Sequence, residues 1–168
     1  PPAEALRRAA DLFATLEAVH RAGVLHRDLK PGNLLFRDAV PLAADVPDLV
    51  LGDFGLADLE RRGDAMAAGS LPYLAPEARR GAFSQASDVY AGGVILFEML
   101  AGAHPFDRAA ILRGDTRWDG TLPDPIRAAT SAANTAALAE ILANLLPPEA
   151  DARPAPAAAR DAIAALLH

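Results

Sequence analysis

The chain has 168 residues, a length that fits one domain with a sizeable hydrophobic core. Its 22 acidic and 16 basic residues give a net charge of −6, which argues against a nucleic-acid partner bound by bulk electrostatics. There is no cysteine, so disulfides and thiolate metal sites are excluded and a reducing compartment is compatible with the composition.

An amphipathic helix is predicted over residues 3–22. Apolar residues recur there at helical spacing, with charged residues largely on the other face. Gly23 is well placed to end this helix. The same stretch lacks the charged-then-apolar pattern of a signal peptide, and we therefore expect a cytoplasmic protein.

Residues 24–25 are predicted to be extended, and the polar run HRDLKPGN follows at residues 26–33. Two short apolar runs follow at 34–36 and 49–51, and the prolines between them predict a small β-hairpin with a long connection. Residues 53–77 show little periodicity and predict a long irregular segment. Segments of that kind are usually functional.

The remainder is predicted to be helical. Nearly every residue of 87–101 is apolar, which predicts a helix buried on all sides. The apolar run 89–102 contains Glu98 and is shorter than the ~20 residues of a membrane span, so no membrane segment is expected. Further helices are predicted at 106–112, from a cap at Asn134 to Leu146, and at 157–167. The fold class is mainly α with a small β-hairpin.

Five stretches carry a resemblance to a known family. They are HRDLKPGN (26–33), LGDFGLADL (51–59), GSLPYLAPE (69–77), SDVYAGGVILFEMLAGAHPF (87–106) and DARP (151–154). Their order and spacing resemble the eukaryotic-like serine/threonine protein kinase family, specifically its larger C-terminal lobe, over residues 1–168. The resemblance implies a protein-kinase-like fold in which residues 26–33 form the catalytic loop and residues 53–77 the activation segment.

The resemblance also implies the roles of the reactive groups. Asp28 accepts or orients the proton of the substrate hydroxyl, and Lys30 offers a point charge to the transferring phosphate of ATP. Asn33 and Asp53 bind Mg²⁺ through oxygen atoms, the ligands that a hard cation prefers. Leu35 resembles the apolar residue that forms the floor under the adenine.

Other positions resemble the structural support of such a site. His26 is expected to contact Phe54, and Gly55 completes the Asp-Phe-Gly motif. Further supporting contacts are expected as follows: Ser70 with Asp28 and Lys30, Glu77 with Arg153 as a buried ion pair, and Asp88 with the backbone of the catalytic loop.

The residues themselves also allow plainer interpretations. Asp28 is then a turn carboxylate, Lys30 a solvated surface lysine and Asn33 a turn cap. Leu35 is an ordinary core leucine on that reading, and Asp88 caps a helix, which is compatible with its supporting role.

Substrate class is indicated by two details. Lys30, together with Gly-Ser-x-x-Tyr before Ala-Pro-Glu, resembles the serine/threonine branch, whereas tyrosine kinases typically differ at both places. The implied partner is a protein with a serine or threonine acceptor. Sugar and antibiotic kinases generally lack the sequence HRDLKPxN, which makes a small-molecule acceptor a distant option.

The 168 residues depart from the family pattern by lacking the N-terminal lobe, with its glycine-rich loop and its strand lysine. We therefore expect the isolated chain to bind ATP weakly, to have negligible activity and to expose apolar surface near Leu35 and Phe54.

The alternative function is a catalytically inactive kinase-like module that docks partners. The abundance of Ala, Arg, Gly and Pro suggests a bacterial source with a GC-rich genome.

Arg27 resembles the arginine of kinases that are switched by phosphorylation of the activation segment. Residues 54–69 nevertheless contain no Ser, Thr or Tyr. We expect either that phosphorylation of this segment is not the switch or that Glu60 or Asp64 partly substitutes for a phosphate.

Overall fold

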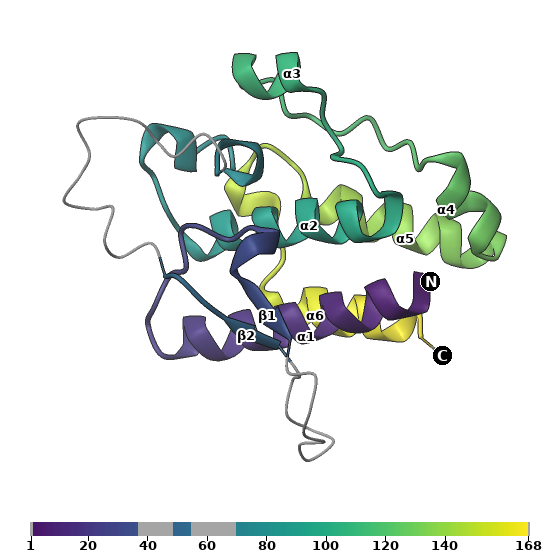
Figure 1. The fold of residues 1–168 in the computed structure, drawn as a ribbon, viewed down its shortest axis with the longest axis horizontal. Coiled ribbons are helices and arrows are strands. Elements are labelled where there is room, and N and C mark those ends of the chain that lie inside the picture. Colours follow the sequence, from purple (N-terminus) through teal and green to yellow (C-terminus); the bar gives the residue numbers. More distant parts are fainter. Residues whose placement is uncertain (1, 37–48, 55–69, 168) are drawn as a thin grey trace.

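The computed structural model describes residues 2–36, 49–54 and 70–167 of the chain. Helices dominate this part (Figure 1). The α-helices are α1 (Pro2–Arg21), α2 (Gln85–Ala101), α3 (Arg108–Arg113), α4 (Asp124–Ala129), α5 (Ala132–Leu145) and α6 (Pro156–Ala165). Single turns of 3₁₀-helix are η1 (Pro31–Asn33), η3 (Leu71–Tyr73), η4 (Ala78–Arg80) and η5 (Ala150–Ala152).

The predicted hairpin is confirmed with the predicted bounds. β1 (Leu34–Phe36) pairs antiparallel with β2 (Leu49–Leu51), and Leu34 lies opposite Leu51. Successive side chains of a strand point to opposite faces, so Leu34 is buried whereas Leu35 is 56% exposed. The predicted connection, residues 37–48, lies outside the described residues.

The central helix is α2, whose side chains are buried from Ser87 to Phe97, as the all-apolar pattern predicts. It begins two residues earlier than predicted because Ser84 and Ser87 form a capping box. Asp88 therefore lies inside the helix, and the interpretation of Asp88 as a cap is wrong.

Helices α1 and α6 lie side by side, and α1 also packs on α2 (Figure 1). The predicted first helix is confirmed, and Gly23 follows it with a φ of 77°. In the described ranges there is no helix that is both long enough and apolar enough to cross a membrane.

Capping residues account for the differences at the starts of α5 and α3. α5 begins at Ala132 because Ser131, not Asn134, is the cap: the backbone N–H of Asn134 donates to Ser131 Oγ at 3.2 Å. Asp107 caps α3 in the same way, which moves its start from the predicted residue 106 to Arg108. α4 is a short helix that the sequence analysis did not single out.

Candidate active site

A buried carboxylate anchors the start of the polar run 26–33. Asp88 Oδ2 accepts the backbone N–H of His26 at 2.9 Å, and Asp88 Oδ1 accepts that of Arg27 at 2.9 Å. The predicted contact between Asp88 and this backbone is thus present. Asp88 is fixed in turn by His20 at the end of α1, whose Nε2 lies 2.7 Å from Asp88 Oδ2. Both side chains are buried, so the attachment is shielded from solvent.

The sequence analysis missed His20. A signal was available, because His20 lies four residues after Leu16 and therefore continues the apolar stripe of α1. A polar residue on a buried stripe requires a polar partner.

Arg27 occupies a backbone conformation that L-residues rarely adopt. Its φ of 69° lies in the left-handed region, and the two hydrogen bonds to Asp88 hold the chain there. Its Nε and Nη1 atoms are buried and find no hydrogen-bond partner among the residues that the structure describes. Such atoms favour an anion nearby. Glu60 and Asp64, which the sequence analysis suggested for that place, lie outside the described residues.

Three side chains of the polar run converge. Lys30 Nζ lies 2.7 Å from Asp28 Oδ2 and donates to Ser70 Oγ at 3.1 Å. Asn33 Nδ2 donates to the backbone oxygen of Asp28 at 2.8 Å and to its Oδ2 at 3.3 Å. The predicted contact of Ser70 with Lys30 is present, and Lys30 connects Ser70 to Asp28. The side chains of Asp28 and Lys30 are 24% and 27% exposed, so a ligand can reach both.

The hairpin brings Asp53 beside this cluster. The backbone N–H of Gly52 donates to the carbonyl of Asn33 at 2.9 Å, which extends the β1–β2 pairing by one residue. Asp53 follows at once with a φ of 47° and an exposed side chain. Asp53 therefore lies one residue beyond the hydrogen bond that joins Gly52 to Asn33.

His26 supports the same junction. Its ring lies 4.7 Å from that of Phe54, which is the predicted contact, and its Nε2 lies 3.0 Å from the carbonyl of Gly52. Burial lowers the pKa of His26 below 6.5, although Asp88 opposes this shift. A carbonyl oxygen only accepts hydrogen bonds, so Nε2 of His26 carries the proton that it donates to Gly52. Gly55, the next residue of the motif, lies outside the described residues.

The oxygen atoms around Asn33 fit a magnesium ion. Since Asn33 Nδ2 is engaged by Asp28, its Oδ1 remains available as a ligand, and Asp53 offers an exposed carboxylate. In the described ranges there is no cluster of three or more His, Asp or Glu side chains that would enclose a metal. Mg²⁺ does not need one, because it usually takes one or two carboxylates together with water and substrate phosphates.

An ion pair ties the segment after Ser70 to the C-terminal helices. Arg153 Nη1 lies 2.6 Å from Glu77 Oε1, Arg153 Nη2 donates to Glu77 Oε2 at 3.0 Å, and the Arg153 side chain is fully buried. Burial alone would raise the pKa of Glu77, but hydrogen bonds from Arg153, the backbone and Ser87 outweigh it and lower that pKa. The predicted pair is therefore present in a bidentate geometry.

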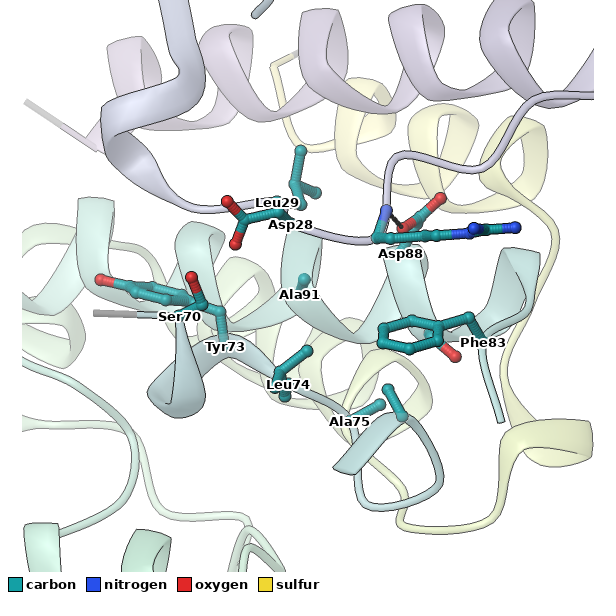
Figure 2. A pocket seen from close by; sticks show the side chains of 12 residues that line it. Asp28, Leu29, Ser70, Tyr73, Leu74, Ala75, Phe83, Asp88 and Ala91 are labelled. Atoms are coloured by element: carbon teal, nitrogen blue, oxygen red, sulfur yellow. Dashed lines mark hydrogen bonds between the residues drawn. The ribbon is translucent and has the colours of Figure 1, made fainter. Parts of the chain in front are cut away.

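A small pocket lies between the polar run and the segment that contains η3 and η4. Figure 2 shows its lining, in which Asp28 and Leu29 come from the polar run and Ser70, Tyr73 and Leu74 from the other segment. The Tyr73 hydroxyl donates to Glu98 Oε2 at 2.9 Å, and burial and the Glu98 carboxylate raise the pKa of Tyr73. Tyr73 thus lines the pocket with its hydroxyl protonated and hydrogen-bonded to Glu98.

The apolar surface expected near the site is present only in part. Leu35 is largely exposed, whereas Phe54 is half-buried and packs against the core. The interpretation of Leu35 as an ordinary core leucine is wrong, since a core residue would be covered.

The comparison with protein families gives the class of the chain. The protein kinase domain family matches residues 2–162. The chain therefore belongs to the protein kinase family, and its helical architecture with a two-stranded antiparallel sheet is a protein-kinase-like fold.

The chain is also similar to individual protein kinases. The chain is 44% identical over 97 residues to a calcium and calcium/calmodulin-dependent serine/threonine-protein kinase of Oryza sativa subsp. japonica, covering 56% of this chain and 18% of that protein. It is 44% identical over 106 residues to calcium-dependent protein kinase 24 of the same organism, covering 60% and 20%. It is 42% identical over 97 residues to lectin-domain containing receptor kinase VI.3 of Arabidopsis thaliana, covering 55% and 13%.

The matched parts of these relatives thus amount to a fifth of their length or less. The relatives are plant proteins, so the comparisons do not support the bacterial source suggested by the composition.

Proposed function

We propose that this chain is the C-terminal lobe of a serine/threonine protein kinase, with residues 26–33 as the catalytic loop and residues 53–77 as the activation segment. The intact protein transfers the γ-phosphate of ATP to a serine or threonine hydroxyl of another protein. The observation that carries this proposal is the convergence of Lys30 and Asn33 on Asp28, whose Oδ2 lies 2.7 Å from Lys30 Nζ and 3.3 Å from Asn33 Nδ2.

Phosphoryl transfer needs the positioning of reactants and charges more than it needs covalent catalysis. The Asp28 carboxylate accepts the proton of the acceptor hydroxyl while the hydroxyl oxygen bonds to phosphorus and the bond to ADP breaks. Lys30, whose Nζ lies 2.7 Å from that carboxylate, places a positive charge where the phosphoryl group passes.

Asn33 Oδ1 and the Asp53 carboxylate are the atoms that would hold Mg²⁺, which would neutralise charge on the phosphates of ATP. Asn33 has a second role: its Nδ2 donates to Asp28 and so keeps the reactive carboxylate near the metal ligands. Leu35, exposed beside Gly52 on β1, offers an apolar surface that suits a purine base.

A transfer assay with the intact protein tests the proposal. With ATP labelled on the γ-phosphate, magnesium and a mixture of protein acceptors, we expect label on serine and threonine after acid hydrolysis, and none when the metal is chelated. Label on tyrosine only, or on a small molecule only, would contradict the substrate class. The absence of any transfer would favour a docking module without catalytic activity.

A further inference from the structure

Arg79 in η4 is a half-buried arginine bound by backbone carbonyls. Its Nε donates to the carbonyl of Leu74 at 3.2 Å and its Nη2 to that of Leu71 at 3.3 Å. Its Nη1 donates to the carbonyl of Ile111 in α3. The guanidinium of Arg79 thus connects Leu71 and Leu74 with α3, which lies about 30 residues further along the chain.

The partners of Arg79 are neutral. Its hydrogen-bond partners are backbone carbonyls, no carboxylate among the described residues forms an ion pair with it, and burial lowers its pKa. Hydrogen bonds from a charged donor are about twice as strong as neutral ones, and a planar guanidinium directs them at fixed angles. The arrangement therefore favours a fixed backbone geometry over charge pairing.

The segment held by Arg79 leads directly to the reactive carboxylate. Leu71 follows Ser70, which accepts a hydrogen bond from Lys30, and Lys30 pairs with Asp28. Within residues 70–74 the backbone hydrogen bonds run from Tyr73 N to Ser70 O and from Leu74 N to Leu71 O. Its other supports come from outside the segment: the Tyr73 hydroxyl donates to Glu98 Oε2 at 2.9 Å and His104 Nε2 lies 3.1 Å from the carbonyl of Pro72. Arg79 adds the hydrogen bonds to the carbonyls of Leu71 and Leu74.

The helix at the other end of the connection stands apart from the main helical layer. Figure 1 shows α3 separated from α2 and α5, and its principal contacts are with η3. Arg79 thus binds α3 to the side of the pocket that Ser70, Tyr73 and Leu74 line.

We propose that Arg79 is a positioning residue for the protein acceptor: by binding Leu71, Leu74 and Ile111 it holds residues 70–74 in the shape that the acceptor needs beside Asp28. This inference rests on the proposed kinase function. Arg79 should affect the binding and reaction of the protein acceptor and should not affect the binding of ATP. The contacts of Arg79 lie on the Ser70 side of Asp28 and not on the β1–β2 side.

The test compares Arg79→Ala and Arg79→Lys with Arg80→Ala in the intact protein. Arg80 is the exposed neighbour in the same turn and is the matched control. For Arg79→Ala we expect kcat/KM for the protein acceptor to fall about tenfold or more, a loss equivalent to about one charged hydrogen bond. The KM for ATP should stay within about twofold of wild type. Arg79→Lys should not restore the acceptor kinetics, since a single ammonium cannot reach three separated carbonyls.

Amide hydrogen exchange supplies a readout that does not depend on activity. Tyr73 and Leu74 amides should exchange faster in both Arg79 variants and at the wild-type rate in Arg80→Ala. Unchanged acceptor kinetics in Arg79→Ala, or full rescue by lysine, would overturn the inference. Equal losses for acceptor and ATP would overturn it as well, by indicating a general structural role. A wild-type protein without any transfer activity would instead overturn the proposed function itself.

Discussion

Asp88 Oδ1 accepts the backbone N–H of Arg27 at 2.9 Å, and Arg27 has a φ of 69°. A buried carboxylate of α2 therefore stabilises a strained residue directly before Asp28. We expect Asp88→Ala to lower the free energy of unfolding of the 168-residue chain by roughly 2–4 kcal/mol, because two buried N–H groups lose their acceptor. Urea unfolding followed by the fluorescence of Trp118, the single tryptophan, measures the change.

Asp88→Asn retains one acceptor oxygen and should cost less than Asp88→Ala. The exposed Asp115 is the control, and Asp115→Ala should leave the unfolding midpoint unchanged. Equal stability of Asp88→Ala and wild type would show that Asp88 does not support this backbone.

The bidentate pair of Glu77 and Arg153 leads to a second prediction. Removing one partner of a buried pair leaves the other charge unpaired, so we expect Glu77→Gln and Arg153→Met each to destabilise by roughly 3–5 kcal/mol. The double variant should lose less than the sum of the two single losses. A double-mutant cycle from urea unfolding measures the coupling, and additive losses would contradict a direct interaction.

The same pair predicts a dependence of stability on pH. The pKa of Glu77 lies below its ordinary value of 4.5 in the folded chain. The ionised carboxylate therefore contributes stability that is fully present above pH 4.5 and is lost as the pH falls through the lower, folded-state pKa. Urea titrations at a series of acidic pH values should show a steeper loss for wild type than for Glu77→Gln. Parallel curves would contradict the assignment.

Two adjacent glycines of α2 set how closely its neighbours approach. A Cβ added at Gly93 would lie 2.8 Å from Leu145 Cβ, and one at Gly92 would lie 2.9 Å from Phe13 Cζ. We expect Gly93→Ala to destabilise by about 1–3 kcal/mol in spite of the better helix propensity of alanine.

Gly92→Ala should cost less than Gly93→Ala, because the end of a phenylalanine ring can shift whereas Leu145 Cβ is attached to the backbone. Thermal unfolding followed by circular dichroism measures both variants. The opposite order, or stabilisation by both, would be inconsistent with the packing of α2 against α1 and α5.

The sequence predicted those parts of the fold whose determinants are local. The two short apolar runs at 34–36 and 49–51 defined the hairpin, and the apolar run of α2 defined a buried helix. Several contacts of the candidate site, such as His26 with Phe54 and Glu77 with Arg153, followed from the resemblance to a family. The roles of Asp28, Lys30, Asn33 and Asp53 in transfer remain proposals.

What the sequence did not predict depends on long-range geometry or on competition among similar residues. Ser131 and Asn134 are both good caps, and only the structure shows which one the helix uses. Arg79 and Arg80 are identical in type, yet the first binds carbonyls of distant segments and the second is exposed. His20 likewise acquires its role only when α1 is packed against α2.

The most direct test of the central claim is phosphate transfer by the intact protein in which Asp28 is replaced by asparagine. We expect wild type to phosphorylate serine or threonine in a protein acceptor. The carboxamide of asparagine keeps the size of the side chain but accepts a proton poorly. Asp28→Asn should lose at least about a thousandfold in kcat while its unfolding midpoint stays close to that of wild type. Undiminished transfer by Asp28→Asn would contradict the account.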